Sequence, residues 1–272
     1  MSNLTPMNSG NCAGDCTEDS GCGAILKVIR PREKDLGGFS VRRLLPVAGQ
    51  QMVGPWIFFD HMGPAFFPAG SGINVRPHPH IGLSTLTYLF EGEIMHRDNT
   101  GAIQAVRPGE VNWMTAGKGI VHSERTTPTK RAEGGPMHGM QAWIALPGES
   151  EDCDPSFHHY AGPDLPAYEN AGLFARLVAG EAYGASARVK TASPLFYVHW
   201  ELAEGVRTAP PPGKGAGGYS ERALYVVKGE IEVGDRSFHE GQMIVLEPTA
   251  EPTVRAIRPS TVMVLGGEPV GP

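Results

Sequence analysis

The sequence lacks several features that would mark a membrane, secreted or nucleic-acid-binding protein. It has no apolar run of the roughly 18 residues that a membrane-spanning helix needs. The first 23 residues have neither the basic stretch nor the apolar stretch of a secretory signal, so the expected location is the cytoplasm. Positive charge is in deficit, with 23 Lys and Arg against 29 Asp and Glu, and the net charge is −6. That balance argues against strong binding of nucleic acid.

Cysteine is also scarce, and it is concentrated at one end of the chain. Three of the four cysteines, Cys12, Cys16 and Cys22, fall in a stretch rich in Gly, Ser and Asp. Their spacing lacks the paired C-x2-C of common zinc sites and a nearby fourth ligand. Residues 1–23 are therefore predicted to form a flexible leader with accessible thiols, and a zinc or cluster site is the alternative.

Long helices have little room in this chain, because 36 Gly and 24 Pro residues are spread over its 272 positions. Short apolar and β-branched runs recur instead, and many are flanked by Gly, Pro or Asp; residues 83–90 and 223–227 are examples. This pattern is typical of an all-β sandwich or barrel with few short helices. One short helical piece is expected around residues 163–168 and another near the domain junction.

An internal repeat indicates a duplication. Residues 86–94 (LTYLFEGEI) resemble residues 223–231 (ALYVVKGEI), and both are read as strand, Gly-Glu turn, strand. A repeat of this kind predicts two β-barrels that derive from one duplicated unit. The expected division is a leader at 1–23, a first unit at 24–150, a connection with the start of the second barrel at 151–195, and a second unit at 196–272.

Two short motifs of paired side chains are the strongest chemical signal. His78 and His80 flank a proline, and His122 and Glu124 flank a serine 44 residues later. Side chains at i and i+2 of a strand share one face, so two such strands facing each other could close a site of three nitrogens and one oxygen. This donor set suits a divalent ion of Fe, Mn, Co, Ni, Cu or Zn, and ligand identity does not select among them.

The repeat allows these four residues to be checked against the second copy. When offsets are counted from the equivalent turn glycines, their counterparts are Gly215, Gly217, Val254 and Ala256. None of these side chains binds a metal ion. The sequence therefore predicts chemistry in the first unit only.

The segments at residues 75–82, 90–92 and 113–124 resemble the signature of the pirin family, and residues 59–64 and 139–143 also look like pirin segments. The resemblance covers roughly residues 25–268. It implies a bicupin fold, meaning two cupin barrels in one chain. It also implies that His78, His80, His122 and Glu124 hold a metal, usually iron, in the N-terminal cupin, and that the C-terminal cupin is metal-free.

The resemblance extends to pirins that act as quercetinases, which open the central ring of flavonols with dioxygen and release carbon monoxide. It implies a metal-dependent dioxygenase acting on a flavonol or another enolisable aromatic, with Glu124 as the general base for a substrate hydroxyl. The alternative is a non-enzymatic, metal- or redox-dependent regulator that acts through a protein partner, such as a transcription complex or a metabolic enzyme. A substrate-sized cavity would favour the enzyme, and a flat, closed site would favour the regulator.

Five further residues are candidates for the surroundings of the metal. His61 is expected either to line the mouth of the pocket or to be a loop residue. Gln141 could hydrogen-bond near the metal, and Met62, Phe58 and Trp113 could form an apolar wall; for each of these four, a place in the core is the alternative.

Overall fold

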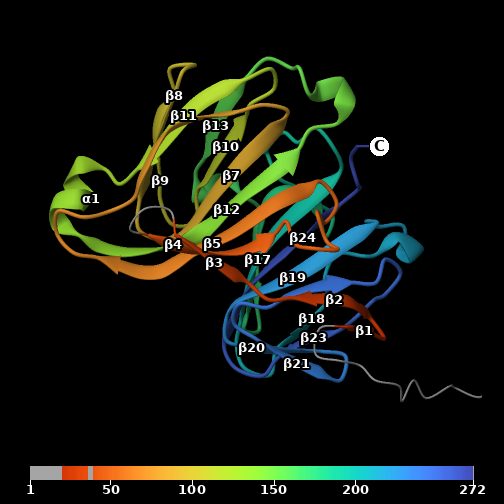
Figure 1. The fold of residues 1–272 in the computed structure, drawn as a ribbon. Helices are drawn as coiled ribbons and strands as arrows, with labels where there is room; N and C mark the ends of the chain where they lie inside the picture. Colours follow the sequence, from red (N-terminus) through yellow and green to blue (C-terminus); the bar gives the residue numbers. More distant parts are fainter. Residues whose placement is uncertain (1–19, 36–38, 272) are drawn as a thin grey trace, which may run out of the picture.

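The computed structural model of the protein describes residues 20–35 and 39–271 (Figure 1). The predicted all-β class is confirmed, because α1 (Pro128–Glu133) is the one α-helix within these residues. Three short 3-10 turns accompany it: η1 (Gly148–Ser150), η2 (Gly162–Asp164) and η3 (Lys214–Ala216). Cys12 and Cys16 of the predicted leader lie outside the described residues, and Cys22 ends strand β1. Within the described ranges, no helix is long and apolar enough to cross a membrane.

The first unit consists of a large and a small antiparallel sheet. The large sheet has the order β13-β10-β7-β12-β5-β4-β3, and the small sheet has the order β6-β11-β8-β9. The strands are β3 (Arg32–Asp35), β4 (Ser40–Leu45), β5 (Trp56–Phe67), β6 (Asn74–His80), β7 (Leu83–Glu91), β8 (Ile94–Asp98), β9 (Ile103–Val106), β10 (Val111–Thr115), β11 (Ile120–Arg125), β12 (Gly135–Ala145) and β13 (Ser156–Tyr160).

The second unit repeats this arrangement. Its large sheet has the order β1-β2-β22-β19-β24-β17-β15-β14, with β16 also paired to β15, and its small sheet has the order β18-β23-β20-β21. The strands are β1 (Ser20–Cys22), β2 (Ile25–Ile29), β14 (Ala167–Asn170), β15 (Leu173–Ala182), β16 (Ala185–Ser186), β17 (Leu195–Leu202), β18 (Arg207–Thr208), β19 (Glu221–Lys228), β20 (Glu230–Val233), β21 (Arg236–His239), β22 (Met243–Leu246), β23 (Val254–Ala256) and β24 (Ser260–Gly267).

The two strand orders match from β13 to β3 in the first large sheet and from β2 to β14 in the second, and β1 and β16 are additional strands of the second. The repeated sequence places β7 and β19 at equivalent positions, and β12, β5 and β4 then correspond to β24, β17 and β15. The glycines that end the repeat's strands, Gly92 and Gly229, have φ of 90° and 89°, a left-handed conformation that glycine adopts without a steric penalty. Each unit is a sandwich of two sheets, and the duplication predicted from the repeat appears in the topology.

The units exchange strands at their outer edges. Strand β2 pairs with β22 of the second unit, and Figure 1 shows it among the blue C-terminal strands although it comes from the N-terminal part of the chain. Strand β13 pairs with β10 of the first unit. Residues 25–29, assigned to the first unit in the sequence-based division, therefore complete the sheet of the second.

One of the hydrophobic core clusters spans both units. Buried residues of the first unit, such as Trp56 and Phe59, belong to the same cluster as Tyr197 and Tyr225 of the second. The ring of Trp56 lies 4.9 Å from that of Tyr197, and its indole N–H donates to the carbonyl of Gly266 at 3.1 Å. Because the two units share buried apolar surface, we expect them to unfold as one cooperative body.

Candidate metal centre

The four predicted ligands lie on two neighbouring strands of the small sheet. Strands β6 and β11 are antiparallel partners, with His122 opposite His78 and Ile120 opposite His80. The motifs therefore lie side by side in one sheet, whereas the sequence suggested two strands facing each other. Ligand atoms of His78, His80 and His122 all lie within 4.8 Å of one another. A shift in register between His122 and Glu124 alters the strand at the point where the carboxylate follows the imidazole.

The imidazole nitrogens are available for a metal ion. Nε2 of His80 and Nε2 of His122 are buried and have no hydrogen-bond partner among the residues that the structure describes. Nδ1 of His78 lies 2.9 Å from the carbonyl oxygen of Arg76, so Nδ1–H donates and Nε2 keeps its lone pair. Buried polar atoms without partners are rare in folded proteins. Three converging lone pairs are what a transition metal requires, and the residues present fit such an ion.

Burial also keeps two of these side chains neutral. Desolvation, followed by the neighbouring imidazoles, lowers the pKa of His122 to about 3 and that of His80 to about 4. Neutral imidazole is the form that binds metals, so both side chains are ready to bind at neutral pH without losing a proton.

The Glu124 carboxylate is held by a second set of contacts. It forms an overlapping cluster of possible ligands with His122 and His96. The hydroxyl of Thr87 on β7 lies 3.0 Å from Oε1 of Glu124 and 2.9 Å from Oε1 of Gln141. Thr87 was not among the residues predicted from the sequence; it falls at an inward-facing position of the first repeat copy.

His96 on β8 is a further residue that the sequence analysis did not assign to the site. Its Nε2 lies 2.8 Å from Oδ2 of Asp98, and its Nδ1 lies 3.4 Å from Nδ1 of His122. If Nε2–H of His96 donates to the carboxylate, Nδ1 of His96 accepts from Nδ1–H of His122, and Nε2 of His122 is left free for a metal. The signal in the sequence was an H-x-D pair on the strand after the first Gly-Glu turn.

Replacement of His96 by Phe is expected to lower the affinity for a divalent transition metal by about 10- to 100-fold. Phe keeps the stack on Phe157, whose ring lies 4.3 Å away, but it removes the acceptor that orients His122. Competition with a chromophoric chelator measures the affinity, and the exposed residue His158, replaced by Phe, is the control. An unchanged dissociation constant in His96→Phe would mean that His122 needs no such support.

The metal-ligand cluster opens into a half-open cavity of about 200 Å³ between the two sheets of the first unit. Its aromatic wall is the pair Phe58 and Trp143, which stack with centroids 4.1 Å apart at an angle of 11°. The edge of Trp143 contacts His80, with centroids 4.8 Å apart. The cavity therefore presents flat apolar surface directly beside the imidazole cluster.

An ion pair between the part-buried Arg43 and the buried Asp60 forms the polar part of the same wall. Nε and Nη2 of Arg43 donate to the two oxygens of Asp60, both at 2.9 Å. The guanidinium of Arg43 lies 4.3 Å from the centre of the Phe58 ring. Burial raises the pKa of Asp60, and the hydrogen bonds and charge of Arg43 act in the opposite direction. Neither residue was predicted from the sequence, because a lone Arg and a lone Asp on separate strands form no motif.

The five other candidates divide between the cavity and the core. Phe58, Met62 and Gln141 line the cavity. Trp113 lies instead in the core shared by the two units, where its indole N–H donates to Thr115 at 3.1 Å. His61 lies on the opposite face of β5 from Asp60 and Met62, as the alternation of a strand requires, and it points to the junction between the units.

At that junction His61 forms a buried chain of hydrogen bonds. Its Nδ1 lies 2.6 Å from the hydroxyl of Tyr225 in the second unit, and its Nε2 lies 2.7 Å from Nε2 of His138. Desolvation is the largest cause that lowers the pKa of His61 to about 2, and the charges of Arg42 and His138 add to it. The ring is therefore neutral in the folded protein throughout the physiological range.

This neutrality predicts a loss of stability in acid. In the unfolded chain His61 takes up a proton below its ordinary pKa of 6.5, whereas the folded protein does not until the pH approaches about 2. Unfolding is thus favoured as the pH falls below 6.5, by about 1.4 kcal/mol per pH unit for this group. Urea unfolding of metal-free protein at pH 7 and pH 5.5 measures this effect. Between the two pH values, the free energy of unfolding of His61→Asn should fall by about 1 kcal/mol less than that of wild type. Equal losses in the two proteins would contradict this assignment.

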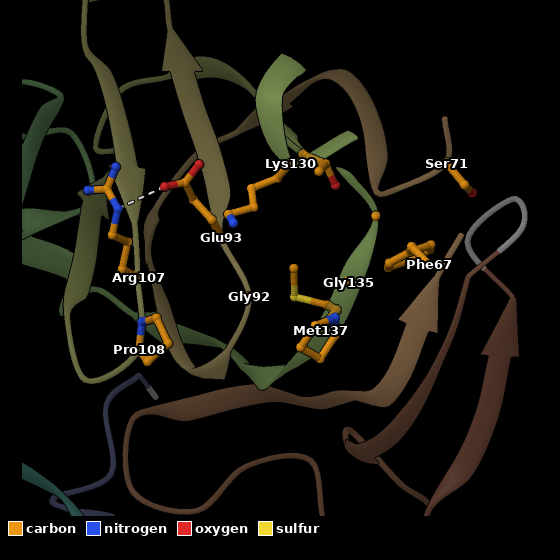
Figure 2. A pocket seen from close by; sticks show the side chains of 12 residues that line it. Phe67, Ser71, Gly92, Glu93, Arg107, Pro108, Lys130, Gly135 and Met137 are labelled. Atoms are coloured by element: carbon orange, nitrogen blue, oxygen red, sulfur yellow. Dashed lines mark ion pairs between the residues drawn. The ribbon is translucent and has the colours of Figure 1, made fainter. Parts of the chain in front are cut away.

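A separate hollow of about 310 Å³ lies between α1 and the turn at Gly92 (Figure 2). Its wall carries an ion pair between Arg107 and Glu93 at 2.8 Å, and Lys130 extends over it from α1. No histidine or cysteine is among its lining residues within the described chain. It is therefore distinct from the metal-ligand cluster.

The duplicated sandwich topology is that of a two-cupin protein. One of its two units carries a cluster of His and Glu side chains that suits a divalent metal ion. The pattern of the pirin family matches residues 38–144, and that of the pirin C-terminal cupin domain matches residues 197–272. The chain belongs to the pirin family, as the resemblance of its motifs predicted.

Individual relatives agree with this assignment. A pirin-like protein of Caulobacter vibrioides is 57% identical over 248 residues, which cover 90% of this chain and 84% of the relative. A Pseudomonas aeruginosa protein, which its name gives provisionally as a quercetin 2,3-dioxygenase, is 36% identical and covers 100% of this chain and 83% of its own. The crystal structure of quercetin 2,3-dioxygenase from Acinetobacter baumannii superimposes with a TM-score of 0.82 at 36% identity, covering 90% of this chain and 79% of that chain.

Proposed function

We propose that the protein is a metal-dependent dioxygenase that acts on a flavonol such as quercetin or on another enolisable aromatic. The metal, for which we propose iron, would be held by His78, His80, His122 and Glu124. One observation carries this proposal: two buried imidazole nitrogens without partners point toward a third, beside a cavity with an aromatic wall. The names of the Pseudomonas and Acinetobacter relatives support the same reaction class.

The bound metal would supply Lewis acidity toward a substrate hydroxyl and the redox capacity that dioxygen chemistry needs. The chain's own acid–base group is Glu124, which accepts the proton of that hydroxyl. The hydroxyl of Thr87 lies 3.0 Å from Oε1 of Glu124 and 2.9 Å from Oε1 of Gln141, and its one proton orients the carboxylate when it is donated to Glu124. No other carboxylate of the cavity wall is free for this role within the described residues, because both oxygens of Asp60 accept from Arg43.

The cavity walls orient the substrate and limit its size. The stacked rings of Phe58 and Trp143 offer a flat face to an aromatic ring and keep water from one side of it. A volume of about 200 Å³ is smaller than that of sites which enclose a whole drug-sized ligand, about 300–1,000 Å³. We infer that one ring of the substrate enters beside the imidazoles and that the remainder lies at the open mouth.

The alternative function, a regulator without catalysis, requires no cavity beside the metal. An enzyme needs an accessible cavity for its substrate, whereas a redox regulator could work with a closed metal site. The open cavity with an aromatic wall therefore favours the enzyme. Binding of a protein partner would belong to the regulator and is a separate proposal. Reaction with dioxygen distinguishes the dioxygenase from the regulator.

The test is oxygen uptake by protein that has been reconstituted with Fe(II) without air and then mixed with quercetin in oxygenated buffer. We expect metal-dependent oxygen consumption with release of carbon monoxide, and neither with the metal-free protein. Glu124→Gln should lower kcat by about 100-fold or more, because the neutral amide takes no proton from the substrate. Stoichiometric iron without oxygen uptake would contradict the flavonol dioxygenase and favour the regulator.

A further inference from the structure

The second unit contains a cavity at the position that corresponds to the metal cavity of the first. The metal cavity is lined from β4, β5 and β6 as well as from three other strands. The matching strand orders make β15, β17 and β18 their counterparts, and these three strands line a cavity of about 380 Å³ together with β14 and β16. We call this the second cavity; it lies within the size range of about 300–1,000 Å³ of small-molecule sites.

The chemistry of the second cavity differs from that of the first. In the metal cavity the lining cross-strand pairs of β4 and β5 are the ion pair Arg43 with Asp60 and the apolar pair Val41 with Met62. In the second cavity the lining pairs of β15 and β17 are Ala175 with Trp200 and Leu177 with Val198. The described lining residues include no charged side chain and no histidine or cysteine. A charged ligand or a metal ion would lose its hydration there without compensation, so a ligand must be neutral and largely apolar.

Two tyrosines shape the opening, and the buried Trp200 lies in the wall. Tyr168 and Tyr183 lie on the rim with 57% and 53% of their surfaces exposed, unusually high values for such large side chains. The hydroxyl of Tyr183 is hydrogen-bonded to the indole of Trp200 and donates to the carbonyl of Ala209 at 2.9 Å. These bonds hold the Tyr183 ring at the mouth and leave its faces free for stacking.

The backbone at Tyr183 has an uncommon conformation. Its φ is 53°, in the left-handed region that a non-glycine residue adopts only at an energetic cost. Gly184 follows with φ of 77°, and positive φ at both residues is what the tight two-residue turn between β15 and β16 requires, so the turn explains this conformation. Inside the cavity the small side chains of Ala175, Ala182 and Ala185 line the wall, and any larger residue at these positions would reduce the space.

We propose that the second cavity is a metal-independent binding site for a small neutral aromatic molecule, which would stack against the exposed rings of Tyr168 and Tyr183. The hydroxyls of Thr208 and Tyr168 are side-chain groups of the lining that could hydrogen-bond such a ligand. The duplication thus left one unit with a metal-binding cavity and the other with an apolar cavity on corresponding strands. This site does not depend on the reaction proposed for the first unit.

The test uses N-phenyl-1-naphthylamine, a neutral aromatic probe that fluoresces in apolar surroundings, with metal-free protein. We expect saturable binding to wild type, and binding at least about tenfold weaker in Ala175→Phe because the new ring occupies the cavity. The matched control is Ala132→Phe, which adds the same ring to an exposed position of α1 far in sequence from the site.

Each outcome decides the proposal. Equal affinity of Ala175→Phe and Ala132→Phe, or no saturable binding to wild type, would overturn it. Thermal unfolding shows whether Ala175→Phe is folded; if it is not, Ala185→Leu on the half-buried strand β16 takes its place and is judged in the same way. Binding in the metal cavity alone would leave the affinities of both second-cavity variants unchanged and would therefore refute the proposal.

Discussion

His80→Ala is expected to abolish stoichiometric binding of a divalent transition metal, with a loss of affinity of at least about 100-fold. Removal of groups that only support a ligand already costs 10- to 100-fold, and His80 would donate directly. Its Nε2 is one of the two buried imidazole nitrogens without a partner, and the residues that follow it, Ile81 and Gly82, have no side-chain donor. Metal content after reconstitution and dialysis, together with chelator competition, measures the effect.

The control for this experiment is His158→Ala, which removes an exposed histidine of β13 outside the cluster. It should keep the metal content and affinity of wild type. Far-ultraviolet circular dichroism verifies that His80→Ala is folded. Retention of one metal ion per chain at wild-type affinity in His80→Ala would show that the ion binds elsewhere.

Trp56→Ala is expected to lower the free energy of unfolding by about 3–5 kcal/mol, the usual effect of removing a large aromatic from a core. Trp56 is fully buried at the junction, where its ring packs on Tyr197 and its indole N–H satisfies the Gly266 carbonyl. The variant loses the packing of both units at once and leaves that carbonyl without its donor. Urea unfolding, followed by circular dichroism and by tryptophan fluorescence, measures the change.

The matched control is Phe66→Ala, on the same strand but with 75% of the Phe66 surface exposed. Its stability should stay within about 0.5 kcal/mol of wild type. The two probes should also report a single transition in wild type, because the shared core couples the units. A change below about 1 kcal/mol in Trp56→Ala, or two separated transitions in wild type, would contradict a common core.

Much of the architecture was predictable because its causes are local. Short apolar runs between Gly and Pro residues predicted strands, and the similarity of residues 86–94 to residues 223–231 predicted the duplication that the matching sheet orders show. The exception is the expected helical piece at residues 163–168, where a 3-10 turn at Gly162–Asp164 is followed by β14. The exchange of β2 and β13 between the units was not predictable, since the partner of an edge strand depends on long-range pairing.

The candidate site likewise contains residues that a local sequence pattern predicted and residues that only the tertiary structure brings together. The spacing of His78 with His80 and of His122 with Glu124 was visible because alternation along a strand is a local property. Arg43, Asp60, Thr87 and His96 were not assigned to the site, because each comes from a different strand and only pairing between strands brings it to the metal cavity. His61 had the correct residue type for a ligand, but its position beside Asp60 on β5 turns it to the other face.

The sequence by itself determined which residues could chelate a metal, which half of the chain carries them and that both halves share one strand plan. These properties follow from side-chain chemistry and from periodicities of a few residues. The tertiary structure alone decided that the two histidine motifs are neighbours in one sheet, that His96 contacts His122, and that the second unit keeps an apolar cavity on corresponding strands. The physical reason is that sheet pairing and core packing join residues tens to hundreds of positions apart, and no local pattern records those distances.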